Sequence, residues 1–397
     1  WLVFLETSTA IDPEVLKGFL AKYDDQQEHY LGRSVEDVES SIIHHYSTDT
    51  AYPVAQAGFA VSWPLVRRLA RDLREKPSGR NQQIEPVWEF AKWVKEVGVE
   101  LTNRSDAFCV ARRDGCATWV SHGPRASYRL QPKDVLVAVK TVSHFHESRI
   151  PVMQDVWGEA SGVDVVYLSN EGFSGVPSAE VVDLSTEFGD MVDPKREATK
   201  QGSGHCSKME AILKYLFRHR RGRRWYVVVD DDTLLNVPRL LEVLDSYDDS
   251  MALSVGERYG WSHTEYSSGS NYITTGGGVA LSEPALKMLN ECETCACRVP
   301  HAPDDMTLGT WMTSLGVPIL HEEAFHQSEP HNYHPEVLAA SEPAVSFHRY
   351  GVWLPASAKP EEVGRARRAN WRQWAKEHFY SQRGASQAHD GGRSVEL

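Results

Sequence analysis

Short apolar runs alternate with helical patterns in the second half of the chain. Three runs rich in β-branched residues, at 135–139, 163–168 and 226–229, have the composition of strands buried on both faces. Between them, 144–157 and 206–219 carry apolar residues at helical spacing. Because alternating strands and helices form helix-covered parallel sheets, the pattern predicts a three-layer α/β fold with a mainly parallel sheet.

The same pattern occurs a second time near the start of the chain. WLVFLETST at 1–9 aligns with WYVVVDDDT at 225–233, and further matches follow at one constant offset. After a small change in length, GFAVS at 58–62 aligns with GVALS at 278–282. An ordered set of matches indicates two copies of one domain, the alternative being two unrelated α/β domains of similar pattern.

The two copies differ where polar residues follow the strand. The aspartates at 230–232 align with Glu-Thr-Ser at 6–8, and the acidic pair at 304–305 has no counterpart in the first copy. The first copy also lacks the elements that precede Trp225 in the second. We therefore predict a degenerate, N-terminally truncated, non-catalytic domain over 1–130, a catalytic domain over 131–355, and a final helix with a tail over 356–397.

Composition excludes several classes of protein. The 397 residues are 41% hydrophobic, which is enough to bury sizeable cores and excludes an extended disordered chain. The net charge of -13 gives no long-range attraction to nucleic acid or to anionic lipid. No apolar run approaches the roughly 18 residues of a membrane span. We expect a soluble, acidic, folded protein with no nucleic-acid partner and no membrane span.

Cysteines and short signals favour the secretory pathway. The 6 cysteines permit three disulfides, whose pairing the sequence leaves open, and a zinc site in CETCAC at 292–297 is the weaker alternative. Asn103 begins an N-glycosylation sequon, and the C-terminal SVEL keeps the Glu-Leu ending of a luminal retention signal. Together they predict the endoplasmic reticulum lumen. The start at Trp1, without Met or a signal peptide, indicates that upstream residues were removed.

Three consecutive aspartates follow the apolar run at 226–229. Asp230, Asp231 and Asp232 fall at the carboxyl end of the predicted strand, where open α/β sheets bind ligands. Adjacent carboxylates repel one another unless a cation neutralises them, and hard oxygen ligands suit Mg²⁺ or Mn²⁺ beside the phosphates of a substrate. A solvated acidic turn is the alternative. The sequence does not match the phosphatase-type motif Asp-x-Asp-x-Thr, because Thr233 directly follows Asp232 and the motif requires one residue between them.

Three further features carry candidate chemistry. TTGGG at 274–278 lets backbone amides approach a ligand closely, or forms a plain tight turn. Asp304 and Asp305 precede a predicted helix at 307–315, as a general base or as an N-terminal cap. His326 follows an apolar run and is a candidate third metal ligand, although a single histidine is more often structural.

In combination these features resemble the Fringe family of inverting β-1,3-glycosyltransferases, which have a GT-A fold. The resemblance covers 133–350. Its markers are VAVKT at 137–141, FH at 145–146 with Arg149, CSKM at 206–209, the run 225–233, TGGG at 275–278, PDD at 303–305 with Gly309, and FH at 325–326. The segments most similar to the branch that transfers glucose to O-fucose on thrombospondin type 1 repeats are GERYG at 256–260, YIT at 272–274, FHQ at 325–327 and SFH at 346–348.

The resemblance implies a role for each candidate residue. Asp232 and His326, supported by Asp230, would bind Mn²⁺, which bridges the phosphates of a UDP-sugar. Asp305 would be the catalytic base, favoured over Asp304 because Gly309 follows it by four residues, as in the family pattern. The implied donor-binding residues are Asp231, Thr141, Arg149, Gly276, Gly277 and Gly278. The implied acceptor-binding or supporting residues are Asp304, Glu257 and Arg258.

The resemblance also implies the reaction and its partners. An inverting, Mn²⁺-dependent displacement would move glucose from UDP-glucose to the 3-hydroxyl of O-linked fucose on thrombospondin type 1 repeats. One alternative is the same chemistry with UDP-galactose or UDP-GlcNAc as donor. Another is a non-catalytic protein that binds a glycan or a client protein.

Overall fold

The computed structural model describes residues 1–37, 47–76, 85–121, 129–192, 205–261, 270–300, 302–341, 343–355 and 357–379. The C-terminal SVEL therefore lies outside the described residues, as does the segment 122–128 just before the predicted domain boundary. Among the described residues, no helix has both the length and the hydropathy that a membrane span requires.

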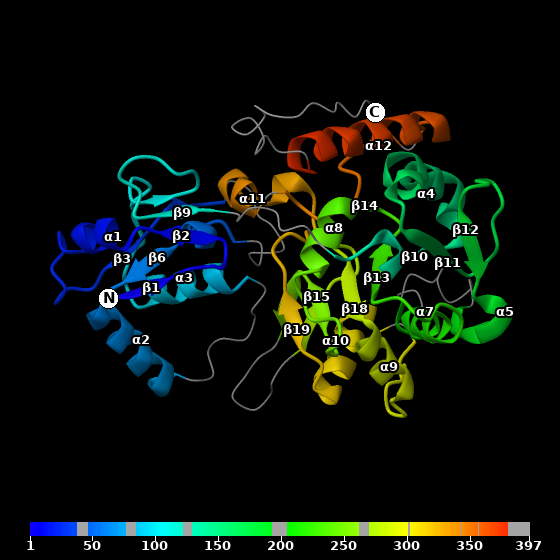
Figure 1. The fold of residues 1–397 in the computed structure, drawn as a ribbon, viewed down its shortest axis with the longest axis horizontal. Coiled ribbons are helices and arrows are strands. Elements are labelled where there is room, and N and C mark those ends of the chain that lie inside the picture. Colours follow the sequence, from blue (N-terminus) through cyan, green and yellow to red (C-terminus); the bar gives the residue numbers. More distant parts are fainter. Residues whose placement is uncertain are drawn as a thin grey trace.

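A mixed sheet of seven strands forms the centre of the second half of the chain (Figure 1). Its strand order is β12-β11-β10-β13-β18-β15-β19. β10 to β13 run parallel, β18 is antiparallel to both of its neighbours, and β19 is parallel to β15. The strands are β10 (Val135–Lys140), β11 (Asp164–Ser169), β12 (Glu180–Asp183), β13 (Trp225–Asp230), β15 (Ser254–Gly256), β18 (Val279–Ser282) and β19 (Ile319–His321). The predicted α/β class is confirmed.

Helices cover both faces of this sheet, which explains why β10 and β13 are apolar up to their last residues, Lys140 and Asp230. Alternate residues of β10 and β13 belong to two separate hydrophobic cores, Val137 and Val227 to one and Ala138 and Val228 to the other. The first core includes α4 (His146–Met153), α8 (Val237–Leu244) and α12 (Pro360–Trp374). The second includes α7 (His205–His219), α9 (Glu283–Glu291) and α10 (Asp304–Leu315).

The helix predicted at 144–157 is the element that departs most from its expected form. It consists of a 3-10 turn, then α4, and then a π turn over Gln154–Gly158. Pro151 lies inside α4 and has no amide hydrogen to donate, which interrupts the regular bonding at that point.

The first half of the chain contains a smaller sheet with the order β1-β6-β3-β7. It pairs β1 and β3 antiparallel to β6, and β7 parallel to β3. These directions match those of β13-β18-β15-β19. The elements are β1 (Leu2–Phe4), β2 (Thr9–Ile11), α1 (Pro13–Leu20), β3 (Tyr30–Gly32), β4 (Ser34–Val35), β5 (Tyr52–Pro53), β6 (Phe59–Val61), α2 (Trp63–Glu75), α3 (Pro86–Glu96), β7 (Thr102–Asn103), β8 (Phe108–Cys109) and β9 (Thr118–Val120).

The two sheets also agree in register. Leu31 lies opposite Ala60, as Val255 lies opposite Ala280. In both halves, a serine hydroxyl at the end of the antiparallel strand accepts a hydrogen bond from the backbone amide of the aligned residue. Ser62 accepts from His29 at 2.8 Å, and Ser282 accepts from Leu253 at 2.9 Å. These are the pairings that the sequence alignment specifies, and they support the predicted repeat.

The two halves contact one another through polar and apolar side chains. The Arg33 guanidinium donates to both carboxylate oxygens of Glu336, at 2.7 and 2.8 Å. Ala340, on α11 (Pro335–Ser341), is part of the hydrophobic core of the first half. The first half is therefore packed against the second.

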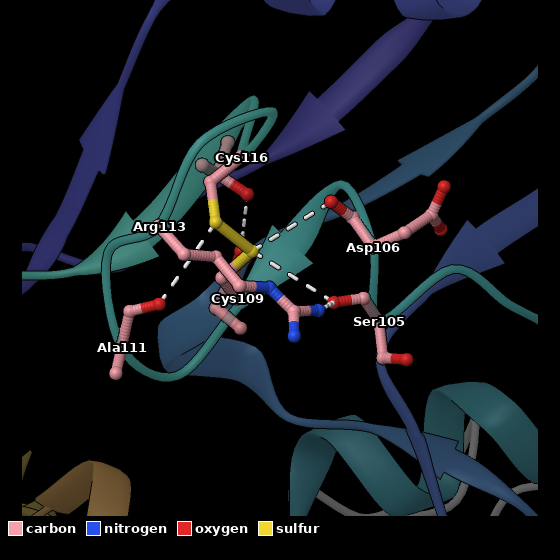
Figure 2. The surroundings of a disulfide bond; sticks show 8 residues. Ser105, Asp106, Cys109, Ala111, Arg113 and Cys116 are labelled. Atoms are coloured by element: carbon pink, nitrogen blue, oxygen red, sulfur yellow. Dashed lines mark hydrogen bonds between the residues drawn. A yellow bond between two sulfur atoms is a disulfide. The ribbon is translucent and has the colours of Figure 1, made fainter.

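All six cysteines form disulfides, between Cys109 and Cys116, Cys206 and Cys297, and Cys292 and Cys295. A zinc site in CETCAC is therefore excluded. Figure 2 shows the first disulfide closing a loop whose Arg113 donates to the carbonyl of Ser105. The second ties the start of α7 to the loop before α10, and so braces two elements that border the site described next.

Candidate active site

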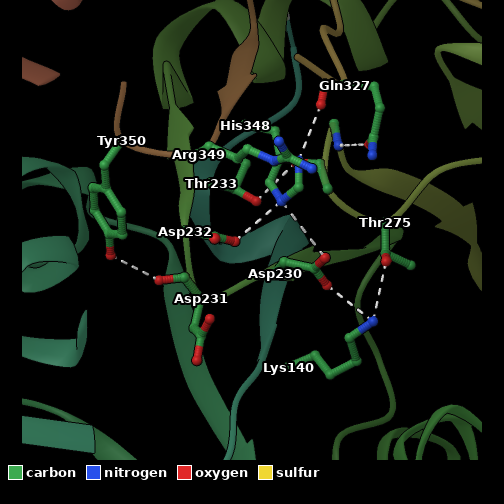
Figure 3. A network of polar contacts seen from close by, with 12 residues as sticks. Lys140, Asp230, Asp231, Asp232, Thr233, Thr275, Gln327, His348, Arg349 and Tyr350 are labelled. Carbon is green, nitrogen blue, oxygen red and sulfur yellow. Dashed lines mark hydrogen bonds and ion pairs between the residues drawn. The ribbon is translucent and has the colours of Figure 1, made fainter. Parts of the chain in front are cut away.

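The carboxyl ends of β10 and β13 lie side by side and carry most of the predicted polar residues. The two strands pair in parallel with Lys140 opposite Asp230, so both deliver side chains to one edge of the sheet. Asp231 and Asp232 follow before β14 (Thr233–Leu235) begins. Figure 3 shows the three aspartates gathered with Lys140 and His348.

Lys140 joins two of the predicted carboxylates. Its Nζ lies 2.9 Å from Asp230 Oδ1 and 2.5 Å from Asp304 Oδ2, and it donates to Thr275 Oγ1 at 3.1 Å. Burial lowers the pKa of Lys140, but the carboxylates of Asp230 and Asp304 outweigh burial and hold the pKa above its ordinary value. A charged ammonium thus links α10 to the aspartate triplet. Sequence reasoning missed this residue, although it lies inside the marker VAVKT.

The structure brings three predicted donor-binding residues together. Arg149 forms an ion pair with Asp231, and the Thr141 hydroxyl donates to Asp231 at 2.6 Å. Burial raises the pKa of Asp231 to about 6, although the charge of Arg149 opposes this rise. The Arg149 guanidinium also lies 2.9 Å from Asp232 and stacks on the ring of Phe145.

Asp230, Asp232 and His348 offer three ligand atoms that lie within 4.8 Å of one another. His348 Nε2 is 3.1 Å from Asp232 Oδ1 and 3.8 Å from Asp230 Oδ2. His348 Nδ1 lies 3.0 Å from the carbonyl oxygen of Gln327. Because a carbonyl only accepts, Nδ1 carries the proton, and Nε2 is the nitrogen turned toward the carboxylates.

The structure does not bring His326, the predicted third ligand, to the aspartates, and His348 lies beside them instead. His326 is 2% exposed, and its ring packs 4.6 Å from that of Tyr333 and 4.8 Å from that of Phe347. Burial lowers the pKa of His326 to about 3. His348 ends β20 (Ser346–His348), which pairs antiparallel with β14 and sets His348 opposite Thr233. The signal for His348 was the segment SFH, a short apolar strand that ends in histidine.

The glycine run makes room for the segments that carry the histidines. A Cβ at Gly276 would lie 2.6 Å from His348 Nδ1, and one at Gly277 would lie 3.1 Å from the amide nitrogen of Gln327. The amide of Gly277 donates to Gln327 Oε1 at 2.8 Å, and that of Gly278 donates to the carbonyl of Thr275 at 3.1 Å. Both amides therefore have partners within the protein, and the donor-binding role of Gly276, Gly277 and Gly278 stays a prediction.

Asp304 and Asp305 begin α10, and neither caps it, because the N-cap residue is Pro303 and forms no side-chain cap. Asp304 pairs with Lys140, as described above. The Asp305 carboxylate accepts a hydrogen bond from the amide of Met306 at 2.7 Å. Burial, together with the charge of Asp304, raises the pKa of Asp305 to about 6. A carboxylate with such a pKa is suited to accept a proton near neutral pH.

Glu257 and Arg258 lie behind the histidine segment and not among the aspartates. Glu257 Oε2 accepts from the amide of Gln327 at 2.5 Å, and Arg258 donates to Asn271 Oδ1 at 2.8 Å. Glu257 therefore supports the segment whose carbonyl orients His348.

Gly309 allows α10 to pack directly on β17 (Ser270–Ile273). A Cβ at this position would clash with the carbonyl oxygen of Asn271 and would lie 2.7 Å from Tyr272 Cβ. Gly309→Ala is expected to displace α10 and to lower the free energy of unfolding by roughly 1–3 kcal/mol, because a packed backbone must shift. Thermal or urea unfolding measures this change.

The matched control for Gly309→Ala is Gly18→Ala, also inside a helix, where an added Cβ meets nothing within 4 Å. That variant is expected to be as stable as the parent or about 0.5–1 kcal/mol more stable. Equal effects of the two substitutions would contradict the packing role of Gly309.

Comparisons with known proteins identify the family of the chain. Residues 130–353 match the family model described as Fringe-like. The chain is 35% identical over 380 residues to a β-1,3-glucosyltransferase of Mus musculus, a match that covers 91% of this chain and 73% of that protein. A β-1,3-N-acetylglucosaminyltransferase of Gallus gallus, lunatic fringe, is 25% identical over 214 residues, 50% of this chain and 56% of that protein. The solved galactosyltransferase LgtC, in complex with donor and acceptor sugar analogs, matches with a TM-score of 0.34 and 13% identity over 59% of this chain and 95% of that one. The chain therefore belongs to the Fringe-like family of β-1,3-glycosyltransferases.

Proposed function

We propose that this enzyme transfers glucose from UDP-glucose to the 3-hydroxyl of O-linked fucose on thrombospondin type 1 repeats, in the lumen of the endoplasmic reticulum. The observation that carries the proposal is the match to the mouse β-1,3-glucosyltransferase, which covers 91% of this chain and so includes its first half. The pairing of all cysteines in disulfides supports an oxidising compartment.

The cofactor we propose is Mn²⁺, held by Asp230, Asp232 and His348. The donor set fits, because two carboxylates and one imidazole offer ligand atoms within 4.8 Å of one another. The hydrogen bond from His348 Nδ1 to Gln327 fixes the tautomer that leaves Nε2 free for a metal. When bound, the ion would stabilise the charge that develops on the leaving diphosphate.

In the proposed mechanism Asp305 removes the proton from the 3-hydroxyl of fucose. The acceptor oxygen then forms a bond to the anomeric carbon of the donor, and the bond from that carbon to the phosphate oxygen breaks, so that UDP leaves with the electron pair. A single displacement inverts the α-linked donor to a β product. Lys140 holds Asp304 in place beside Asp305, and Arg149 and Thr141 orient Asp231 on the donor side.

The pKa of Asp305 sets the expected pH dependence. The base must be deprotonated to act, and its pKa is raised to about 6, so kcat/KM is expected to fall as the pH drops through about 6 and to level off above it. Initial rates from pH 5 to pH 8 at saturating Mn²⁺ measure the profile. Because the charge of Asp304 raises the pKa of Asp305, Asp304→Asn is expected to move the midpoint to lower pH. If Asp304→Asn leaves the midpoint of the pH profile unchanged, a group other than Asp305 determines that profile.

The donor and the acceptor are tested together by release of UDP in the presence of Mn²⁺. UDP-glucose, UDP-galactose and UDP-GlcNAc are offered separately to a folded thrombospondin repeat that carries O-fucose. Turnover with UDP-glucose alone is the expected result. Turnover with UDP-GlcNAc, the donor type in the name of the chicken relative, would replace the donor and leave the family assignment unchanged. Binding of UDP without any turnover would show that the acceptor is a different one.

A further inference from the structure

A cavity lies between the two halves of the chain, outside the active site. Its volume is about 410 Å³, within the range of small-ligand sites. Tyr52 and Gln56 of the first half face residues of the β15–β20 region, including Tyr259 and Tyr333. The proposed transfer reaction assigns no role to this cavity.

Acidic side chains outnumber basic ones on the walls of the cavity. Five glutamates line it, against a single arginine, Arg258. The glutamates are Glu6, Glu85, Glu257, Glu322 and Glu323. The three lining histidines add no countercharge, because burial lowers the pKa values of His321, His326 and His334 below their ordinary range. An anionic ligand such as a nucleotide would be repelled.

Within the described part of the chain, two of these carboxylates have hydrogen-bond partners that are all neutral. Glu257 accepts from the Gln327 amide and from the hydroxyls of Tyr259 and Tyr333, and Glu323 accepts from Gln56 Nε2 at 2.6 Å. No described basic side chain forms an ion pair with either one. Burial raises the pKa of each to about 7. A cation stabilises carboxylates that are shielded from water. Because the described walls place no cation against Glu257 or Glu323, a bound cation would stabilise both carboxylates.

Unsatisfied polar atoms on the walls point to a ligand independently of the charge. Gln56 is 5% exposed, and its Oε1 has no hydrogen-bond partner among the described atoms. His326 is 2% exposed, and its Nδ1 is likewise without a partner there. Because buried polar atoms are nearly always hydrogen-bonded, an acceptor such as Gln56 Oε1 calls for a donor from outside the chain.

We infer that this interdomain cavity binds an organic cation, an ammonium or a guanidinium group. The faces of the tyrosine rings on its walls attract such a cation through cation–π interactions. A guanidinium group also has several N–H donors that can form hydrogen bonds with Gln56 and the glutamates. A divalent metal fits less well, because no three of the lining carboxylates and imidazoles form a compact ligand group among the described residues. A neutral sugar would leave both shielded carboxylates without a countercharge.

The binding test uses agmatine, which carries both a guanidinium and an ammonium group, with glucose as the neutral probe. Calorimetric titration is done with the active site filled by UDP and Mn²⁺, so that the aspartate cluster is unavailable to the probe. Saturable binding of agmatine, weakened at least tenfold by Glu323→Gln and by Gln56→Leu, is expected. Glu323→Gln keeps the shape of the side chain, and retained UDP binding shows that each variant is folded.

The matched control is Glu291→Gln, on the exposed end of α9 and away from the cavity, which is expected to leave agmatine binding unchanged. Absence of agmatine binding to the parent protein, or equal binding to all variants, would overturn the inference. Binding of glucose in place of agmatine would overturn it as well. These outcomes do not depend on which sugar the enzyme transfers.

A second arm identifies the source of the cation, and this arm rests on the proposed acceptor protein. If the cation is a lysine or arginine side chain of the acceptor protein, Glu323→Gln raises the KM for the folded acceptor and leaves the KM for the donor unchanged. If the KM for the acceptor does not change while agmatine binding is lost, the ligand is a free small cation.

Discussion

Asp305→Asn lowers kcat by about 10²–10⁴-fold, the usual contribution of a general base, while binding of UDP and Mn²⁺ is retained. The reason is that Asp305 lies on α10, apart from the metal-binding group, and that an amide cannot take up the acceptor proton. Asparagine has the same size as aspartate, so the helix start is preserved. Single-turnover rates and calorimetric binding of UDP separate the loss of chemistry from a loss of binding.

Asp248→Asn provides the matched control for Asp305→Asn. Asp248 accepts hydrogen bonds from Ser250 in an exposed turn that is not part of the site. Its replacement is expected to leave kcat unchanged. If Asp305→Asn keeps the full rate and Asp304→Asn loses it, the two carboxylates have been assigned in the wrong order.

His348→Ala weakens Mn²⁺ binding by more than about 100-fold, because removal of a ligand costs more than removal of its supporting hydrogen bond. Turnover is expected to fall with it and to recover in part at high Mn²⁺. Calorimetry or the paramagnetic resonance signal of free Mn²⁺ measures the affinity directly.

The variant His326→Ala distinguishes the roles of the two histidines. This variant is expected to keep its metal affinity but to lose roughly 2–4 kcal/mol of stability, because it leaves a hole among packed aromatic rings. The opposite result, with metal binding lost in His326→Ala and kept in His348→Ala, would restore the original prediction of the third ligand.

Local patterns were sufficient to predict most of the fold. The runs at 135–139 and 226–229, which form most of β10 and β13, are apolar at every position because helices cover both faces of the sheet. The aligned segments of the predicted repeat fall on strands with the same pairing, β6 with β3 and β18 with β15. The irregular helix around Pro151 could not be predicted in detail, since its π turn depends on packing against the rest of the domain.

The site was predicted where its residues share one short segment and missed where it depends on long-range pairing. Asp230 to Asp232 follow their strand directly, and their position at the sheet edge results from local sequence. His326 and His348 both follow short apolar runs, and only the ladder between β14 and β20 decides which of them faces the aspartates. Lys140 was missed for the same reason, because its partner Asp304 is 164 residues away.

The distance along the chain between Asp232 and His348 also has a consequence for how the enzyme matures. The two side chains are separated by 116 residues, and β20 completes the metal-binding group only after nearly all of the catalytic half has been synthesised. A nascent chain that ends before β20 carries the aspartates without the imidazole. If the proposed metal binds Asp230, Asp232 and His348, it would therefore stabilise only a domain that already includes β20.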